Sequence, residues 1–495
     1  MNDSSQKSLP TRRLHARVTL ETLTPLHMGS GEETEVADAG IVTDANGLPV
    51  IPGSGLAGVL RSLYLNDSGS SAVVSLFGSS GSKARSGDGQ GSRLQITWAH
   101  IHSEKDCPVD GIAAPDTLQD DPVIQDALAP NLRDHVRINH RGVADAEEGG
   151  KFDEISLSAG HRFTFALELL PASGESAEDL EAEWQRLLAC IRSPRFRLGG
   201  RTRRGFGAVR IHAANWRNFD LTNRNDLDDY LALPVSLAEL APQLTERIEP
   251  AGAEEHLDSK ELTIFDLRLR PRAHWLFGGE GDGSETSSAT DMQPLCESRI
   301  DWSAENGPQP VSRYILPGAG IKGALAHRVA FHDNCLRERF VDDPANGAPK
   351  TGNENESVRW LFGYIDQDKE EKPEIDQAPG RVRIDDAYID PAHIRTQVLN
   401  HVKIDAFTGG AWPGALFDET VCYGGPEAGI PIRIHIDHTG VEDAPSNGSD
   451  AAIALRALDH ALRDLLTGFL PLGGGSGRGH GRFEALPAAD SSRID

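Results

Sequence analysis

The feature that most constrains the fold of this 495-residue chain is an ordered set of six motifs that occurs twice. The most distinctive is a glycine-rich, arginine-rich loop at residues 196–210, with a second version at residues 469–483. Five motifs precede each loop in the same order: a Pro-Gly segment (52–58, 317–323), Leu-Phe-Gly (76–78, 361–363), two related segments (93–101, 381–389), His-Val-x-Ile (135–138, 401–404) and Phe-Asp-Glu (152–154, 417–419). This self-similarity predicts two tandem copies of one structural unit.

Both copies indicate the same order of strands and helices. Apolar and polar residues alternate over 14–21 and 265–269, which is typical of a half-buried strand. Apolar residues at helical spacing follow the first Pro-Gly segment and precede each glycine loop: Leu56, Val59, Leu60 and Leu63; Leu180, Trp184, Leu187, Leu188 and Ile191; Ile453, Leu458, Leu462, Leu465 and Leu466. The order β-α-β…β-α-β predicts an α+β chain of two ferredoxin-like (RRM-like) domains, each with both helices on one face.

Composition sets the expected boundaries. The first domain is expected over 1–215 and the second over 261–487, with a frayed tail at 488–495. Residues 216–260 are polar and acidic, and we expect a linker with one helix around Leu237–Ala241. Glycine- and serine-rich residues 79–92 and 276–289 are expected to be inserted loops.

Charge and cysteine content exclude several classes of protein. A net charge of -26 argues against a generic polyanion binder, yet residues 192–210 hold seven arginines and no acid. An acidic body with one basic stripe favours a specific nucleic-acid groove. Five scattered cysteines without a Cys-x-x-Cys pair make a cysteine-based zinc site improbable. We expect a cytoplasmic protein without a membrane span, because no long apolar run or secretory signal is present.

The glycine loops carry the chemistry of a phosphate-binding site. Exposed backbone amides in such turns form an anion-binding concavity. Arg201, Arg203 and Arg204 in the first loop, with Arg478 and His480 in the second, would supply charge and donors for phosphate. Two such loops predict two modules that hold one nucleic-acid backbone.

The whole set of motifs resembles the RAMP superfamily, specifically the repeated backbone subunits of type III CRISPR RNA-guided effector complexes. The first copy adds His27-Met-Gly-Ser-Gly31 and Asp38 to the motifs above. The second copy adds Phe277-Gly-Gly-Glu-Gly281 and Asp291. Fusion of two copies in one chain is more similar to the variant type III systems than to the standard ones.

The resemblance implies a role in antiviral defence. Such subunits hold a guide CRISPR RNA, and a β-hairpin thumb in each module displaces one nucleotide at regular intervals. An aspartate after the first strand then cuts the paired target RNA with a weakly bound divalent metal, Mg²⁺ or Mn²⁺. The implied partners are a large polymerase-like subunit and small subunits of the same ribonucleoprotein.

The resemblance also nominates catalytic and metal-binding residues. Asp38 precedes Asp44 at the family's spacing, although the proline and arginine of the family pattern are missing. Asp291 keeps a nearby proline, Pro294, and Asp301 is a rival candidate. Asp38 and Asp291 are therefore expected to be catalytic and to hold the metal.

The remaining candidates are RNA contacts. Ser54, Arg61 and Lys322 lie where a helix N-terminus and charge can meet phosphate. Arg137, Asn139 and Arg141 are expected to begin the first thumb, and Lys403 and Thr408 the second. His27 is expected to contact RNA or pack, and a general-base role is less favoured because Phe277 is aligned with it in the second copy.

Three alternatives stay open at this point. The chain could be a scaffold that binds guide RNA without cutting, and only Asp38 and Asp291 distinguish this from the endoribonuclease. It could instead be a metal-independent guide-processing endoribonuclease, for which a two-copy chain is unusual. A nucleotide-binding enzyme lacks support, because no Gly-x-x-x-x-Gly-Lys-[Ser/Thr] motif is present.

Overall fold

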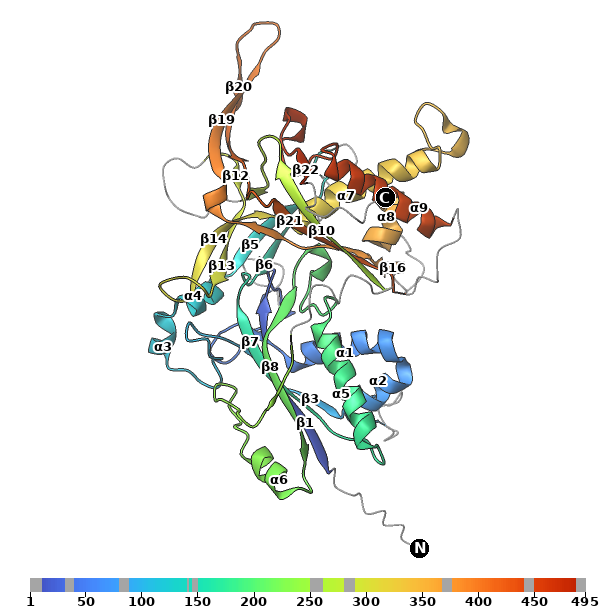
Figure 1. Cartoon of the computed structure of the whole chain (residues 1–495). Helices are drawn as coiled ribbons and strands as arrows, with labels where there is room; N and C mark the ends of the chain where they lie inside the picture. The colour runs from blue at the N-terminus through green and yellow to red at the C-terminus, as the bar shows by residue number, and fades with distance from the viewer. Residues whose placement is uncertain are drawn as a thin grey trace.

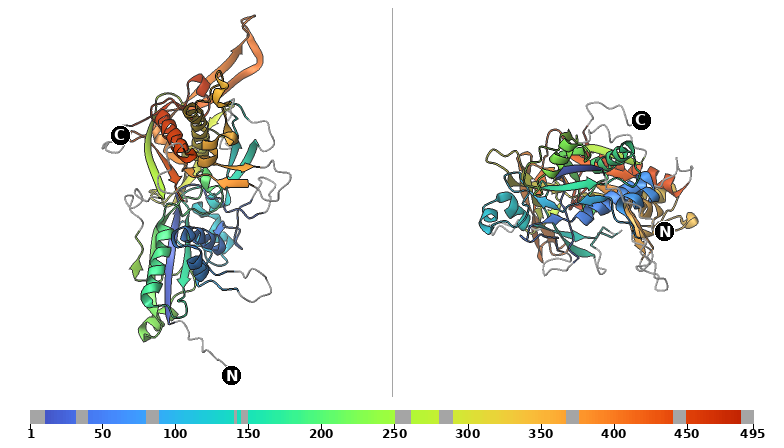
Figure 2. Two further views of the ribbon diagram at one scale, coloured as in Figure 1. Left: turned by 90° about the vertical axis from the view of Figure 1, so that its right-hand side faces the viewer. Right: turned by 90° about the horizontal axis from the view of Figure 1, so that it is seen from below.

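The computed structural model contains two stacked modules of the same architecture (Figures 1 and 2). It describes residues 11–31, 40–79, 89–139, 142–144, 150–249, 261–279, 290–366, 376–439 and 449–486. We call residues 11–249 module 1 and residues 261–486 module 2. Within these described residues, no helix is long and apolar enough to cross a membrane.

Module 1 is a ferredoxin-like unit. Its central strands lie in the order β3/β4–β7–β1–β8, all antiparallel to their neighbours, and α1 and α5 cover one face with α2 (Figure 1). The elements are β1 (Arg12–Thr22), β2 (Val50–Ile51), α1 (Gly53–Ser68), α2 (Ser70–Phe77), β3 (Leu94–Ile96), β4 (Ala99–Ile101), α3 (Pro115–Gln119), α4 (Pro122–Leu128), β5 (Asn131–Val136), β6 (Lys151–Ser156), β7 (Arg162–Leu169), α5 (Ala177–Arg192), η1 (Thr202–Arg204), β8 (Val209–Asp220), α6 (Arg224–Leu231) and β9 (Glu246–Arg247).

Module 2 repeats this topology. Its main sheet has the order β17–β21–β10–β22, which matches β3–β7–β1–β8, and α7 and α9 pack together on one face of it with α8. The elements are β10 (Leu262–Pro271), β11 (Gly278–Gly279), β12 (Gln293–Pro294), β13 (Cys296–Asp301), β14 (Gln309–Leu316), α7 (Gly318–Leu336), η3 (Pro344–Asn346), η4 (Gly352–Glu354), α8 (Glu356–Phe362), β15 (Gly363–Asp366), β16 (Asp376–Pro379), β17 (Val382–Ile384), β18 (Ala387–Ile389), η5 (Pro391–His393), β19 (Arg395–Ile404), β20 (Ala411–Tyr423), β21 (Ile430–Asp437), α9 (Asp450–Leu466), η6 (Ser476–Arg478) and β22 (Phe483–Ala485). The prediction of two tandem ferredoxin-like domains is confirmed.

The period-two pattern of β1 explains why the helices cover only one face. Leu14, Ala16, Val18 and Leu20 are almost fully buried and contribute to the core of module 1. Alternate side chains on a strand point to opposite faces. His15, Arg17, Thr19 and Glu21 therefore lie on the face of the sheet away from α1 and α5. Residues of module 1 cover part of that second face, where Arg17 bonds the carbonyls of Pro234 and Glu239, whereas the part around Glu21 faces module 2.

The expected linker is wrong over most of its length. Residues 216–220 complete β8, and Trp216 pairs with Glu246 in β9. Ile248 is buried in the core of module 1. Module 1 thus extends to at least residue 249, and its extra helix is α6 rather than the predicted segment 237–241.

The expected loops and tail fall largely outside the described residues. This holds for residues 80–88, 250–260, 280–289 and 487–495. At the start of the predicted 276–289 loop, however, Leu276 and Phe277 are buried. Their apolar side chains pack inside module 2, which corrects that part of the prediction.

Each module carries a long β-hairpin. Thumb 1 (β5 and β6) lies between the modules, whereas thumb 2 (β19 and β20) projects from the far end of module 2 (Figures 1 and 2). Both hairpins leave the main sheet between its second and third strands in chain order. The duplication therefore extends to the hairpins.

Module 2 contacts module 1 along β13, and we call the contact region between the two modules the seam. The amide of Ile300 donates to the carbonyl of Ala159 at 2.9 Å, and Trp302 Nε1 donates to the carbonyl of Gly160 at 2.7 Å. Deeper in this seam, Arg133 of thumb 1 bonds Glu297 and Asp386, and all three side chains are at most 3 % exposed. Removal of one member of such a buried group leaves an uncompensated charge, which is strongly unfavourable.

Candidate nucleic-acid interface

The same cluster of side chains lies at the base of each thumb. In thumb 1, the ring of His135 stacks on Phe152 with centroids 5.0 Å apart, and His135 Nε2 is 3.1 Å from Glu154 Oε2. In thumb 2, His401 stacks on Phe417 at 4.7 Å, and its Nε2 is 2.8 Å from Glu419 Oε1. The cross-strand pairs His135–Phe152 and His401–Phe417 occupy the same register. We call these two sets the thumb-base clusters.

Each glycine loop completes its own cluster with arginine. Arg204 donates to Glu154, and its guanidinium lies 4.6 Å from the centroid of Phe152. Arg478 donates to Glu419 at 2.6 Å and lies 5.5 Å from the centroid of Phe417. Both glutamates are almost fully buried, at 2 % and 0 % side-chain exposure. Each arginine is thus held by a carboxylate while more than a third of its side chain stays exposed.

The first cluster holds a further arginine, and the second holds a further histidine. Arg201 Nε lies 2.9 Å from Glu154 Oε1, and the buried His480 lies 3.7 Å from Glu419. Burial alone would raise the pKa of Glu154, but His135 and the two arginines lower it. Burial lowers the pKa of His480, although Glu419 opposes the shift. Glu154 is therefore charged at neutral pH, and the cationic side chains have a fixed counter-charge.

Sequence reasoning did not assign roles to Glu154, Glu419, His135 or His401. It used their motifs only as landmarks of the repeat. The signal was nevertheless present, because each His-Val-x-Ile motif is followed by Phe-Asp-Glu and then by an arginine in the glycine loop. In the structure, these three segments meet at one point.

The predicted thumb residues lie nearer the hairpin tips than expected. Arg137 is exposed just beyond the end of β5, and Lys403 is exposed near the end of β19, over the ring of Trp412. Thr408 belongs to the turn of thumb 2, where its hydroxyl bonds Asp405. Asn139 lies in the tip of thumb 1, whereas Arg141 lies outside the described residues. Exposed cations at the tips are compatible with backbone contacts to RNA.

His27 is buried against glycine loop 1 rather than exposed to a ligand. Its Nδ1 bonds the carbonyl of Ile155 at 2.7 Å, and its own carbonyl accepts from Gly200. In module 2, Gly474 donates to Leu276 in the same way. Leu276 is therefore the structural equivalent of His27, which corrects the alignment with Phe277 by one residue. This arrangement favours a packing role for His27.

The Pro-Gly helices present two different environments. Ser54 and Arg61 are exposed on α1, where they can meet solvent or RNA. Lys322 on α7 instead turns into the seam, and its Nζ donates to the carbonyl of Arg203 at 3.0 Å. Burial, together with Arg203, Arg204 and Arg383, lowers the pKa of Lys322 to about 7. Burial also lowers the pKa of Arg203.

Of the two catalytic candidates, Asp38 and Asp291, the structure describes only Asp291. Asp38 lies outside the described residues, and Asp44 nearby organises a turn by accepting from the amides of Asn46 and Leu48. Asp291 is exposed beside thumb 2: it accepts from the amide of Asp418, which in turn accepts from the amide of Asp291. The backbone of Met292 forms a parallel β-bridge with Glu419, so Asp291 lies next to the second thumb-base cluster.

The rival candidate Asp301 lies elsewhere. It ends β13 in the seam, where the amide and hydroxyl of Ser303 bond its carboxylate and lower its pKa. Among the described residues, no group of three or more histidine, cysteine or acidic side chains is arranged to hold a metal ion. The Asp291–Asp418 pair offers only the few carboxylate oxygens with which a water-rich Mg²⁺ site can be built.

The geometry defines a duplicated ferredoxin-like protein with an arginine-bearing loop and a hairpin in each half. The sequence matches the RAMP superfamily over residues 19–210 and 276–484, one match in each module. The chain therefore belongs to the RAMP superfamily, whose members bind RNA in CRISPR ribonucleoproteins. Comparison with curated proteins found no match.

Proposed function

We propose that this chain is a guide-RNA-binding backbone subunit of a type III CRISPR effector complex that cleaves paired target RNA. The observation that carries the proposal is the presence of one thumb-base cluster in each module. Each cluster combines a partly exposed arginine, a stacked histidine–phenylalanine pair and a hairpin. Arginine donors suit phosphate, and hairpins with exposed side chains can separate neighbouring bases.

The cleavage step is proposed for Asp38 and Asp291, each with a divalent metal. Asp291 is favoured over Asp301 because it lies beside thumb 2, where a base displaced by the thumb would leave the ribose-phosphate exposed. Displacement lets the 2′-hydroxyl approach the phosphate in line, and such orientation is a large part of a rate enhancement. The metal, when bound, would neutralise charge that develops on the phosphate.

The test uses the complex assembled with guide RNA and the chain carrying Asp38→Ala, Asp291→Ala or both. Each single variant is expected to lose one set of cuts in labelled target RNA, and the double variant all metal-dependent cuts. Asp301→Ala is the matched control and should cut normally. Guide RNA should remain bound in every variant.

The outcomes separate the competing functions. Unchanged cutting by the double variant would show that these aspartates are not catalytic. A wild-type complex that retains guide RNA but never cuts would be a scaffold. A particle that assembles without RNA would refute the RNA-binding role itself.

A further inference from the structure

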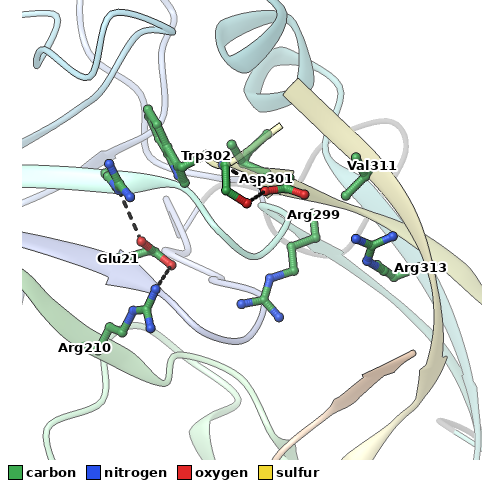
Figure 3. Close-up of a pocket in the computed structure, with 10 residues that line it drawn as sticks. Glu21, Arg210, Arg299, Asp301, Trp302, Val311 and Arg313 are labelled. Carbon is green, nitrogen blue, oxygen red and sulfur yellow. Dashed lines mark hydrogen bonds and ion pairs between the residues drawn. The ribbon is translucent and has the colours of Figure 1, made fainter. Parts of the chain in front are cut away.

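A pocket lies in the seam, on the face of the module 1 sheet away from α1 and α5 (Figure 3). One wall is a cross-strand row in which Glu21 of β1 pairs with Arg162 of β7 and Arg210 of β8. The other wall is the β13–β14 hairpin, with Arg299 paired to Val311 and with Arg313 beyond them. The two rows belong to different modules, so only the docked arrangement forms this site, which we call the seam pocket.

Four guanidinium groups line the seam pocket against two carboxylates, Glu21 and Asp301. Glu21 fixes two of the arginines: Arg162 Nε lies 3.2 Å away and Arg210 Nη2 lies 2.7 Å away. Each guanidinium has five N–H donors, so these contacts leave others unused. The Arg162 side chain is only 9 % exposed.

The two arginines of module 2 differ in how they are held. Arg313 lies 3.1 Å from Asp390. Arg299 has no ion-pair partner within the described ranges, and its guanidinium lies 5.4 Å from the ring centroid of Tyr388. Figure 3 shows Arg299 extending into the space between the two rows. Arg162 also lies over Trp302 at 4.0 Å and bonds Asp106, which fixes its orientation.

The space is large enough for a ligand. The pocket volume is about 460 Å³, and a single water molecule needs only about 10–15 Å³ by the same measure. A phosphate group with part of its sugar fits this volume. An arginine fork can bind either a carboxylate or a phosphate, but arginines presented from several sides can each meet a different oxygen of a tetrahedral phosphate, whereas a carboxylate has only two oxygens.

We propose that the seam pocket binds a phosphate group across the junction of the two modules. Arg299 is the principal donor, and Arg162, Arg210 and Arg313 complete the site. The phosphate can come from an RNA backbone or from a free nucleotide or inorganic phosphate, because the recognised chemistry is the same. This proposal does not depend on target cleavage or on the thumb-base clusters.

The first test is calorimetric titration of the RNA-free full chain with inorganic phosphate and with AMP. Arg299→Gln combined with Arg313→Gln should weaken binding by about tenfold or more, because charge-assisted hydrogen bonds are lost. The control is Arg433→Gln combined with Arg463→Gln, which removes the same charge from two exposed ion pairs elsewhere. The control should change the affinity less than about twofold.

A second measurement on the wild-type chain removes any dependence on folding of the variant. Phosphate should protect Arg299 from an arginine-specific dicarbonyl reagent, as read by mass spectrometry, while Arg463 stays reactive. Equal modification of Arg299 with and without phosphate, or equal affinities of the two double variants, would overturn the proposal.

RNA binding then distinguishes the two sources of phosphate. If RNA supplies it, the pocket variant reduces the salt dependence of guide binding by about one to two phosphate contacts, and the RNA-loaded complex no longer binds free phosphate. If the ligand is a free anion, the RNA-loaded complex binds phosphate as tightly as the RNA-free chain does. If the chain failed to bind guide RNA at the thumbs, the phosphate titration of the RNA-free chain would still test the seam pocket, because that titration needs no RNA.

Discussion

The two modules share one local structure but have different surroundings. Glycine loop 1 and thumb 1 are packed against module 2, where Gly205 lies against Ile384 and Arg133 reaches Glu297 and Asp386. Within the part of the chain that the structure describes, no other module packs against glycine loop 2 and thumb 2. Both hairpins expose large apolar side chains: Leu132, Val136, Ile138 and Val143 in and beside thumb 1, and Val398, Val402, Ile404, Phe407, Trp412 and Leu416 in thumb 2.

This difference distinguishes the features that both modules share from the contacts that hold the modules together. The thumb-base clusters are present in both copies, so they do not arise from docking. One difference at equivalent positions belongs to the seam: Arg133 corresponds to Leu399, because each pairs across its hairpin with the cluster glutamate. A substitution can therefore be made in both copies, and the difference between the two effects measures the seam alone.

The largest difference is expected at this pair. Arg133→Met should reduce the free energy of unfolding by about 3–5 kcal/mol, because it leaves Glu297 and Asp386 buried without their cation. Burial already raises the pKa of Asp386 against the opposing charge of Arg133. Leu399→Met should be close to neutral. Chemical denaturation of both variants checks this, and equal effects would mean that the ion cluster does not hold the seam.

The glycine that follows the short 3-10 helix in each glycine loop gives the second comparison. Gly205 and Gly479 both have positive φ, at +106° and +91°. A Cβ at Gly205 would lie 2.7 Å from the carbonyl oxygen of Ile384, whereas a Cβ at Gly479 would meet nothing within 4 Å. We expect Gly479→Ala to lower stability by about 1–2 kcal/mol through backbone strain, and Gly205→Ala by about 3 kcal/mol. The thermal unfolding midpoints of the two variants measure this difference. Equal midpoints would contradict the packing of Gly205 against module 2.

The third comparison tests the thumb-base clusters. Glu419→Gln should weaken attachment of thumb 2 by about 1–3 kcal/mol, because Arg478 and His401 lose their charged partner. Glu154→Gln should loosen thumb 1 less, since Arg133 still anchors it. Hydrogen exchange of residues 395–423 and 131–156 reports each hairpin. Faster exchange in thumb 1 than in thumb 2 would reverse the expected order.

The smallest effect concerns Lys322, whose equivalent in module 1 is Ala57. The folded chain holds Lys322 with a pKa of about 7, below its ordinary value, so the unfolded chain takes up the proton first as pH falls. Wild-type stability should therefore decline between pH 9 and pH 7. Lys322→Met should remove about 1 kcal/mol of this decline, and Ala57→Met should not change it. A pH series of denaturation curves is the measurement.

The repeat and the core could be predicted from the sequence because both depend on local patterns. The alternation of β1 and the helical spacing in α5 and α9 give correct elements, and the glycine loops lie where the motifs placed them. Residues 216–249 could not be assigned correctly, because β8 is long and half-exposed and its continuation resembles a polar linker.

The contacts in the seam could not be predicted from such local patterns. Arg133 meets residues 164 and 253 positions away, and no motif marks Glu297 or Asp386 as its partners. Likewise, the repeat marks Glu154 in the sequence, but its contact with Arg204 depends on how the glycine loop returns to the thumb. Long-range pairing of charges needs the tertiary fold, whereas periodicity does not.

The contact of β13 with residues 159–160 has a consequence for any strand held by both halves. Because the junction is packed and ion-paired in the protein alone, the protein fixes the spacing between the two thumb-base clusters. An RNA strand bound at both clusters would have to match that spacing.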